Sequence, residues 1–212
     1  MLPQIFTVCL LALPLVVLIL VSILYWLRYG RQEKQGSDKQ HIDYNKFFLT
    51  LVAIGYFSIW IFWLGGIVLL CMDQYFSVLV ALTYPLMQTA FLQIIGFVVF
   101  YIGTLFFAWA VGFAGKSLRP STSDVYTDHK LVQDGPLGIV RHPYYVSYVL
   151  ILVGLSLVLS TLWALLPALC VVIGMGPTAA AEEKELTALF GEQYLQYQRR
   201  VGRFFPRLFK PA

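Results

Sequence analysis

The sequence predicts an all-α integral membrane protein with about five transmembrane helices, the last two forming a tight hairpin that is followed by a cytoplasmic amphipathic helix. Three observations predict this class. Of the 212 residues, 59% are hydrophobic and only 12% are charged, about half the charged share of a soluble domain. The mean hydropathy is +0.74. The charges are also clustered, since none lies in residues 1–27, 47–72, 74–115 or 142–181.

Each uncharged run is long enough to hold at least one membrane helix, for which about 20 apolar residues suffice. Tyr84-Pro85 interrupts the third run, because proline breaks a helix. The fourth run is too long for one crossing, and the polar residues at 156–161 indicate a turn. We therefore expect spans at 5–27, 47–72 and 86–113, an interfacial piece at 76–83, and a hairpin with arms at about 144–157 and 163–175.

The basic residues give the orientation. All 15 Lys and Arg side chains fall in residues 28–46, 116–141 and 184–210. Five spans place these three segments on one side, which the positive-inside rule makes cytoplasmic. The N-terminus is then outside and the C-terminus is cytoplasmic, in a plasma or inner membrane or in the endoplasmic reticulum. The near absence of ionisable residues within the spans disfavours an ion channel or a proton-coupled transporter, and the hydrophobic composition excludes a nucleic-acid-binding module.

Polar residues gather in two segments that flank the expected hairpin. In the first, residues 128–145, glycines and a proline at 135–138 force a turn, and Arg141-His142-Pro143 leads into a helix whose first turn suits proline. The free N–H groups of such a helix start can bind an anion. Alternatively, Arg141, His142, Tyr144 and Tyr145 are interfacial anchors of this helix. The residues alone leave both interpretations open.

The second segment, residues 181–200, has helical periodicity. At 100° per residue, Glu182 and Glu183 share one face with five apolar or aromatic side chains, namely Leu186, Leu189, Phe190, Tyr194 and Tyr197. A carboxylate on a buried face requires a partner, because burying a bare charge is costly. Alternatively, both glutamates lie in the first turn of a helix, where they favour its dipole and stay in water. Both interpretations remain open at this stage.

Residues 128–208 resemble the isoprenylcysteine carboxyl methyltransferase (ICMT) family of integral membrane methyltransferases, whose relatives include the phospholipid N-methyltransferases. The resemblance rests on motifs in a fixed order around an apolar hairpin: His129-Lys-Leu-Val132, Gly135, Arg141-His-Pro-x-Tyr145, Glu182-Glu183, Phe190-Gly-x-x-Tyr194-x-x-Tyr197 and Pro206. It divides the chain into three N-terminal spans at 1–115 and a C-terminal cofactor-binding module at 116–212.

The resemblance implies an S-adenosylmethionine-dependent methyltransferase. Its acceptor would be lipophilic or lipid-linked, for example a prenylcysteine carboxylate, and would enter from the bilayer. Besides this acceptor and membrane lipids it implies no partner, and neither nucleic acid nor metal. The implied cofactor contacts are His129, Lys130, Leu131, Val132, His142, Pro143, Tyr144, Tyr145 and Glu182. A carboxylate such as Glu182 suits the ammonium or ribose of the cofactor. Catalytic residues are not assigned, and Arg141 and Glu183 are the candidates.

Two positions depart from the family pattern. Thr178 stands where the family places an arginine expected to meet the acceptor carboxylate, and Leu137 replaces an aromatic residue. Threonine cannot replace a guanidinium charge, so the identity of the acceptor stays open. Two other functions are consistent with the architecture. One is an NADPH-dependent membrane sterol-type reductase, for which Arg199, Arg200 and Arg203 are candidate 2′-phosphate ligands. The other is a non-catalytic membrane accessory protein.

Overall fold

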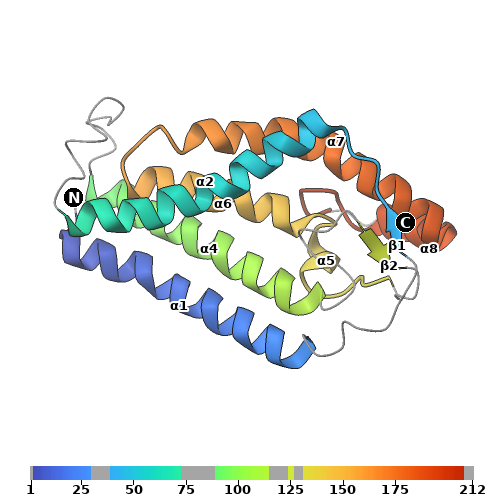
Figure 1. Ribbon diagram of the computed structural model, residues 1–212, viewed down its shortest axis with the longest axis horizontal. Coiled ribbons are helices and arrows are strands. Elements are labelled where there is room, and N and C mark those ends of the chain that lie inside the picture. Colours follow the sequence, from blue (N-terminus) through green and yellow to red (C-terminus); the bar gives the residue numbers. More distant parts are fainter. Residues whose placement is uncertain (1, 30–38, 73–88, 115–123, 127–130, 208–212) are drawn as a thin grey trace.

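The structure, a computed structural model, describes residues 2–29, 39–72, 89–114, 124–126 and 131–207. Its long helices run back and forth along one axis, and the short elements gather at one end, on the right in Figure 1. The long helices are α1 (Gln4–Tyr29), α2 (Lys46–Cys71), α4 (Ala90–Ala114), α6 (Pro143–Val158) and α7 (Leu165–Phe190). The short elements are β1 (Lys39–His41), β2 (Asp124–Tyr126), α5 (Pro136–Ile139) and α8 (Glu192–Arg200).

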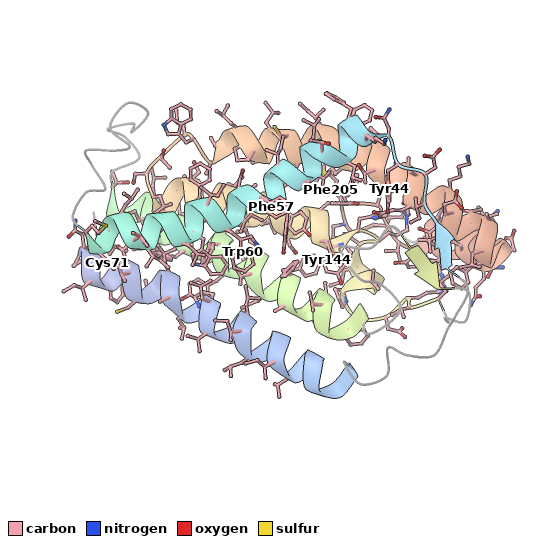
Figure 2. All side chains as sticks on the ribbon, viewed as in Figure 1. Tyr44, Phe57, Trp60, Cys71, Tyr144 and Phe205 are labelled. Atoms are coloured by element: carbon pink, nitrogen blue, oxygen red, sulfur yellow. The ribbon has the colours of Figure 1, made fainter. Side chains whose placement is uncertain are left out.

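The helical membrane class predicted from the sequence is confirmed. Among the described residues, three helices are long and apolar enough to cross a membrane: α2, α7 and residues Ala90–Phe113 of α4. Helix α6 and residues Gln4–Leu20 of α1 are apolar but shorter. Large apolar side chains are exposed along these helices, including Ile5 and Phe91 and the Phe57 that is labelled in Figure 2. Such a surface is unfavourable in water and suits contact with lipid, so the protein is integral to a membrane.

Helix α1 contains a proline, and its neighbours compensate for it. Pro14 has no N–H to donate to the carbonyl of Leu10, which a regular helix would require. The Tyr101 hydroxyl of α4 donates to the Leu10 oxygen at 2.8 Å, and the indole N–H of Trp63 in α2 donates to the adjacent Leu11 oxygen, also at 2.8 Å. Neighbouring side chains that bond freed carbonyls are what allow proline within membrane helices. These bonds fix α1 against α2 and α4.

Glycines allow close packing of the helices that carry the second half of the chain. A β-carbon at Gly154 of α6 would lie 2.5 Å from the backbone nitrogen of Phe100 in α4. A β-carbon at Gly174 of α7 would lie 2.7 Å from the carbonyl oxygen of Phe48 in α2. Small residues of this kind let membrane helices approach closely. Helices α6 and α7, joined by residues 159–164, are thereby held against α4 and α2 respectively.

The C-terminal part of the chain differs from the sequence-based prediction. We expected the second hairpin arm to end near residue 175 and a separate helix to cover 181–200. Instead α7 continues past Pro177 to Phe190. The helix is interrupted at Gly191, which has a φ of 54° and immediately precedes α8. Glu182 and Glu183 therefore lie well inside a helix, which rules out the first-turn interpretation. The predicted interfacial piece at 76–83 lies outside the described residues.

A two-stranded antiparallel sheet was not predicted. Strand β1 precedes α2, strand β2 lies between α4 and α5, and Gln40 is opposite Val125 in the register. The pairing connects the segment before α2 with the segment that leads to α5. Both strands lie at the end of the bundle that carries α5 and α8 (Figure 1). The N-terminal half of the chain therefore contributes to the end where the two polar segments meet.

Candidate functional site

Backbone hydrogen bonds join the segment before α6 to the segment after α8. The N–H of Arg141 donates to the Gly202 carbonyl at 2.8 Å, and the N–H of His142 donates to the Arg203 carbonyl at 3.1 Å. Tyr197 of α8 is buried and its hydroxyl donates to the Leu137 carbonyl of α5 at 2.7 Å. Pro143 occupies the first turn of α6, as predicted. These contacts place Arg141 and His142 directly beside α7.

His142 lies between the two glutamates of α7. Its Nδ1 is 3.1 Å from Glu182 Oε2, and its Nε2 is 3.0 Å from Glu183 Oε1. A neutral imidazole has one N–H and can donate to only one of these oxygens, whereas the imidazolium donates to both. The His142 side chain is 7% exposed, and burial favours its neutral form. The hydrogen bonds and charges of Glu182 and Glu183 outweigh burial and raise the pKa of His142.

Glu183 is buried among cations. Its carboxylate accepts from Arg141 Nε at 2.9 Å and from Arg203 Nε at 3.1 Å, and it also bonds His142. Arg141 in turn donates to the carbonyls of Gln198 and Val201. Both carboxylate oxygens therefore have charged donors, because Arg203 also reaches Oε2 at 2.5 Å. A buried carboxylate satisfied in this way holds the two segments together and has little capacity left for a ligand.

Glu182 has a different environment. Its side chain is 24% exposed, and its Oε1 accepts from the Tyr145 hydroxyl at 2.5 Å and from the Tyr44 hydroxyl at 3.3 Å. The ring of Tyr145 stacks on His142 with centroids 5.8 Å apart. Glu182 is thus a partly exposed carboxylate whose orientation is fixed by a histidine and two tyrosines. This arrangement can present negative charge to a cationic or hydroxyl-bearing ligand.

Tyr44 is a site residue that the sequence did not reveal. It comes from the segment between β1 and α2, at the end of the bundle that carries α8 (Figure 2). Ile42 is 4% exposed and anchors this segment, and the Asn45 side chain caps α2 by accepting from the Phe47 N–H at 3.0 Å. Burial and the charge of Glu182 raise the pKa of the Tyr44 phenol, so Tyr44 stays a hydrogen-bond donor. The asparagine cap was the one available signal that this segment has a fixed conformation.

The other predicted contacts are placed as follows. Leu131 and Val132 are half-buried, and Leu131 packs against the buried cluster that contains Tyr194 and Tyr197. The Tyr144 hydroxyl donates to the Ala110 carbonyl of α4 at 3.3 Å. His129 and Lys130 lie outside the described residues. Arg141 and His142 are buried against Glu183, so the alternative in which they are interfacial anchors does not hold for them.

The fold and this site define a class, a helical membrane protein with a histidine-bridged pair of glutamates at one end of its bundle. Residues 91–193, which run from α4 to the start of α8 and include Arg141, His142, Tyr145, Glu182 and Glu183, match the family model of the phospholipid methyltransferases. No curated protein gives a significant match to the chain.

A solved structure is similar in fold to this chain. The chain is similar to the eukaryotic intramembrane Ras methyltransferase ICMT (isoprenylcysteine carboxyl methyltransferase), with a TM-score of 0.52 and 24% sequence identity. The similarity covers 73% of this chain and 51% of that one, so this chain spans about half the length of that methyltransferase. The shared fold agrees with the helical membrane architecture expected from the sequence, and the family match covers the segments that carry His142 and Glu182.

Proposed function

We propose that the protein transfers a methyl group from S-adenosylmethionine to a lipophilic or lipid-linked acceptor that enters from the bilayer. The observation that carries the proposal is the contact of His142 with Glu182, at 3.1 Å, in the segment that matches the phospholipid methyltransferases. The two residues come from polar segments on either side of α6 and the first part of α7. Their contact creates a partly exposed carboxylate beside a bundle whose sides are apolar.

The residues fit S-adenosylmethionine by the chemistry of their donors and acceptors. Glu182 is exposed enough to accept from an ammonium or from ribose hydroxyls, and we assign the backbone at Leu131 and Val132 to an adenine edge. We assign His142 and Tyr145 to holding Glu182, and keep His129, Lys130, Pro143 and Tyr144 as proposed contacts of the same ligand. When bound, S-adenosylmethionine supplies a methyl group activated by its sulfonium.

The division into residues 1–115 and a cofactor-binding module at 116–212 is likewise proposed, with Tyr44 as the contribution of the first part to the site.

The two catalytic candidates, Arg141 and Glu183, are assigned a positioning role. Their side chains are 8% and 5% exposed and pair with each other at 2.9 Å. Methyl transfer is an in-line displacement at an activated carbon, so holding donor and acceptor in register can provide most of the acceleration. The Arg141–Glu183 pair fixes His142, and His142 fixes Glu182. An acceptor amine or thiol must lose its proton, whereas a carboxylate acceptor needs no base.

Thr178 bears on the choice of acceptor. It is 3% exposed, and its hydroxyl donates to the Gly174 carbonyl of the same helix at 2.8 Å. An acceptor carboxylate would therefore gain no charge-assisted bond at this position. The candidates are a phospholipid amine and a prenylcysteine carboxylate held by other residues, and the product of the reaction distinguishes them.

We also propose five membrane crossings, by α1, α2, α4, α6 and α7, with α6 and α7 as a hairpin, the N-terminus outside and the C-terminus cytoplasmic. The alternating directions of these helices (Figure 1) support this topology, as does the grouping of all Lys and Arg residues in three segments. Reporter fusions after Tyr29, Cys71 and Ala114 test the orientation. A reporter after Cys71 should be active on the outside, and reporters after the other two positions should be active in the cytoplasm.

The central test is cofactor binding by the full chain in lipid nanodiscs, measured by calorimetry. Glu182→Gln should weaken S-adenosylmethionine binding by about tenfold or more, since one charged hydrogen bond contributes about 1.5–3 kcal/mol. Glu192→Gln, which removes an exposed carboxylate of α8, is the matched control and should bind as the wild type does. A folded wild-type protein that binds no S-adenosylmethionine would overturn the proposal.

Activity then separates methyl transfer from the alternatives. The protein is incubated with a membrane extract and methyl-labelled S-adenosylmethionine, and the labelled lipid is identified. Oxidation of NADPH without label transfer would favour the reductase. If Glu182→Ala and His142→Ala leave the cellular role intact, the accessory-protein function replaces the enzyme.

A further inference from the structure

A second polar feature lies beside the candidate site, on the side of Glu183 that faces α8 and the segment after it. It is a pocket of about 360 Å³. Four arginines line it, Arg141, Arg199, Arg203 and Arg207, together with Glu183 and Gln198. The cofactor contacts proposed above do not include its α8 side chains, and the family resemblance gives them no role.

The pocket carries more positive than negative charge. One carboxylate faces four guanidinium groups, and that carboxylate already bonds Arg141 and Arg203. Within the part of the chain that the structure describes, Arg199 and Arg207 have no carboxylate partner; one guanidinium N–H of Arg207 donates to the Arg199 carbonyl. This donation brings the two residues together on one side of the pocket. A cluster of like charge attracts an anion.

We propose that this pocket binds a phosphate group. Guanidinium groups bind phosphate oxygens through paired hydrogen bonds, and several of them together neutralise its charge. The volume is roughly twelve times the ~30 Å³ that one water occupies in the liquid, which leaves room for the group esterified to the phosphate. Leu195 provides an apolar contact for that group.

The position of the pocket gives two sources for such a phosphate. Helix α8, which contributes to its lining, lies at the end of the bundle that carries β1 and β2 (Figure 1), and the proposed topology makes this end cytoplasmic. Anionic phospholipids enrich the cytoplasmic leaflet and draw clustered basic residues to it, so a lipid headgroup is one source. A water-soluble phosphate compound is the other. The lipid source rests on the proposed topology, and neither source depends on methyl transfer.

The test measures thermal unfolding of the full chain in detergent micelles, because a ligand that binds the folded state raises the unfolding temperature. Sodium phosphate is compared with sodium chloride at equal ionic strength, and phosphatidic acid is compared with phosphatidylcholine in mixed micelles. The pocket variant is Arg199→Gln with Arg207→Gln. The control is Lys184→Gln with Arg200→Gln, which removes the same charge from exposed positions outside the pocket.

We expect the phosphate-bearing ligand to stabilise the wild type and the control equally and to bind the pocket variant at least about tenfold more weakly, as loss of one or two charged hydrogen bonds implies. Stabilisation by phosphatidic acid alone identifies a lipid headgroup, and stabilisation by sodium phosphate as well identifies the free anion as sufficient. The proposal is overturned if no phosphate ligand stabilises the wild type. It is also overturned if sodium chloride has the same effect, or if the pocket variant and the control respond alike.

Discussion

Glu183 gives the sharpest test of how the site is held together. Its side chain is 5% exposed and contacts Arg141, at 8%, and His142, at 7%. Replacing it by glutamine keeps the shape but leaves these two buried cations without their shared counter-charge. Breaking a buried ion pair by removing one partner costs about 3–5 kcal/mol. Because glutamine still offers one carbonyl acceptor, we expect about 3 kcal/mol for Glu183→Gln.

This loss is large enough to measure in a membrane protein of this size. For 150–250 residues, each kcal/mol lowers the unfolding midpoint by about 2–4 °C, so Glu183→Gln should lower it by roughly 6–12 °C. The assay is thermal unfolding in detergent, followed through tryptophan fluorescence. Glu192→Gln is the control, since a surface substitution of this kind stays within about 0.5 kcal/mol.

The result that would refute this reasoning is a midpoint for Glu183→Gln within about 2 °C, or about 0.5–1 kcal/mol, of that for Glu192→Gln. The carboxylate would then contribute no more than a solvated one, and the buried network could not be what positions His142. A loss confined to S-adenosylmethionine binding, with an unchanged midpoint, would instead show that Glu183 contacts the ligand directly.

Three further predictions follow from the contacts described. The pKa of His142 is raised in the folded state, so its contribution to stability is complete below about pH 6.5 and is lost as pH rises through the raised value. The difference in unfolding free energy between the wild type and His142→Gln should therefore shrink over that range, and a constant difference would contradict the prediction. Tyr44→Phe removes one hydrogen bond to Glu182 and should weaken S-adenosylmethionine binding about 2–10-fold in calorimetry, with little change in unfolding temperature. An unchanged affinity would exclude Tyr44 from the site. Tyr101→Phe should cost about 0.6–1.7 kcal/mol of stability. The cost should be smaller in a Pro14→Ala background, because the new backbone N–H then bonds the Leu10 carbonyl. Equal costs in both backgrounds would show that the proline does not matter for this bond.

The helical membrane class could be predicted from the sequence because the bilayer strongly restricts which residues can lie within it. Charged residues cannot lie in the hydrocarbon core at low cost, so the edges of the uncharged runs lie within a few residues of both ends of α1 and α2 and of the C-terminal end of α4. Pro143 likewise marked the start of α6, since its fixed φ suits a first turn. The contact between His142 and Glu182 followed from the motif order, not from any spacing rule.

Other features were not predictable, for reasons specific to them. Glycine and proline usually end helices, but membrane helices tolerate both. The end predicted just before Pro177 was therefore wrong, because α7 continues through this residue. Gly191 gave no sign of the true end, because a glycine within a periodic pattern is often retained in the helix. Tyr44 lies 138 positions from Glu182 in a segment without a motif. No local pattern can report a contact at that separation.

The pairing of β1 with β2 constrains how this protein can be recombined with its relatives. A chimera joined at residue 116 would take β1 and Tyr44 from one parent and β2 and Glu182 from the other, so two strands that evolved apart would have to align. A junction before Lys39 transfers both strands and both side chains together. Exchanging the larger piece should therefore preserve the carboxylate geometry, even though it replaces more of the bundle.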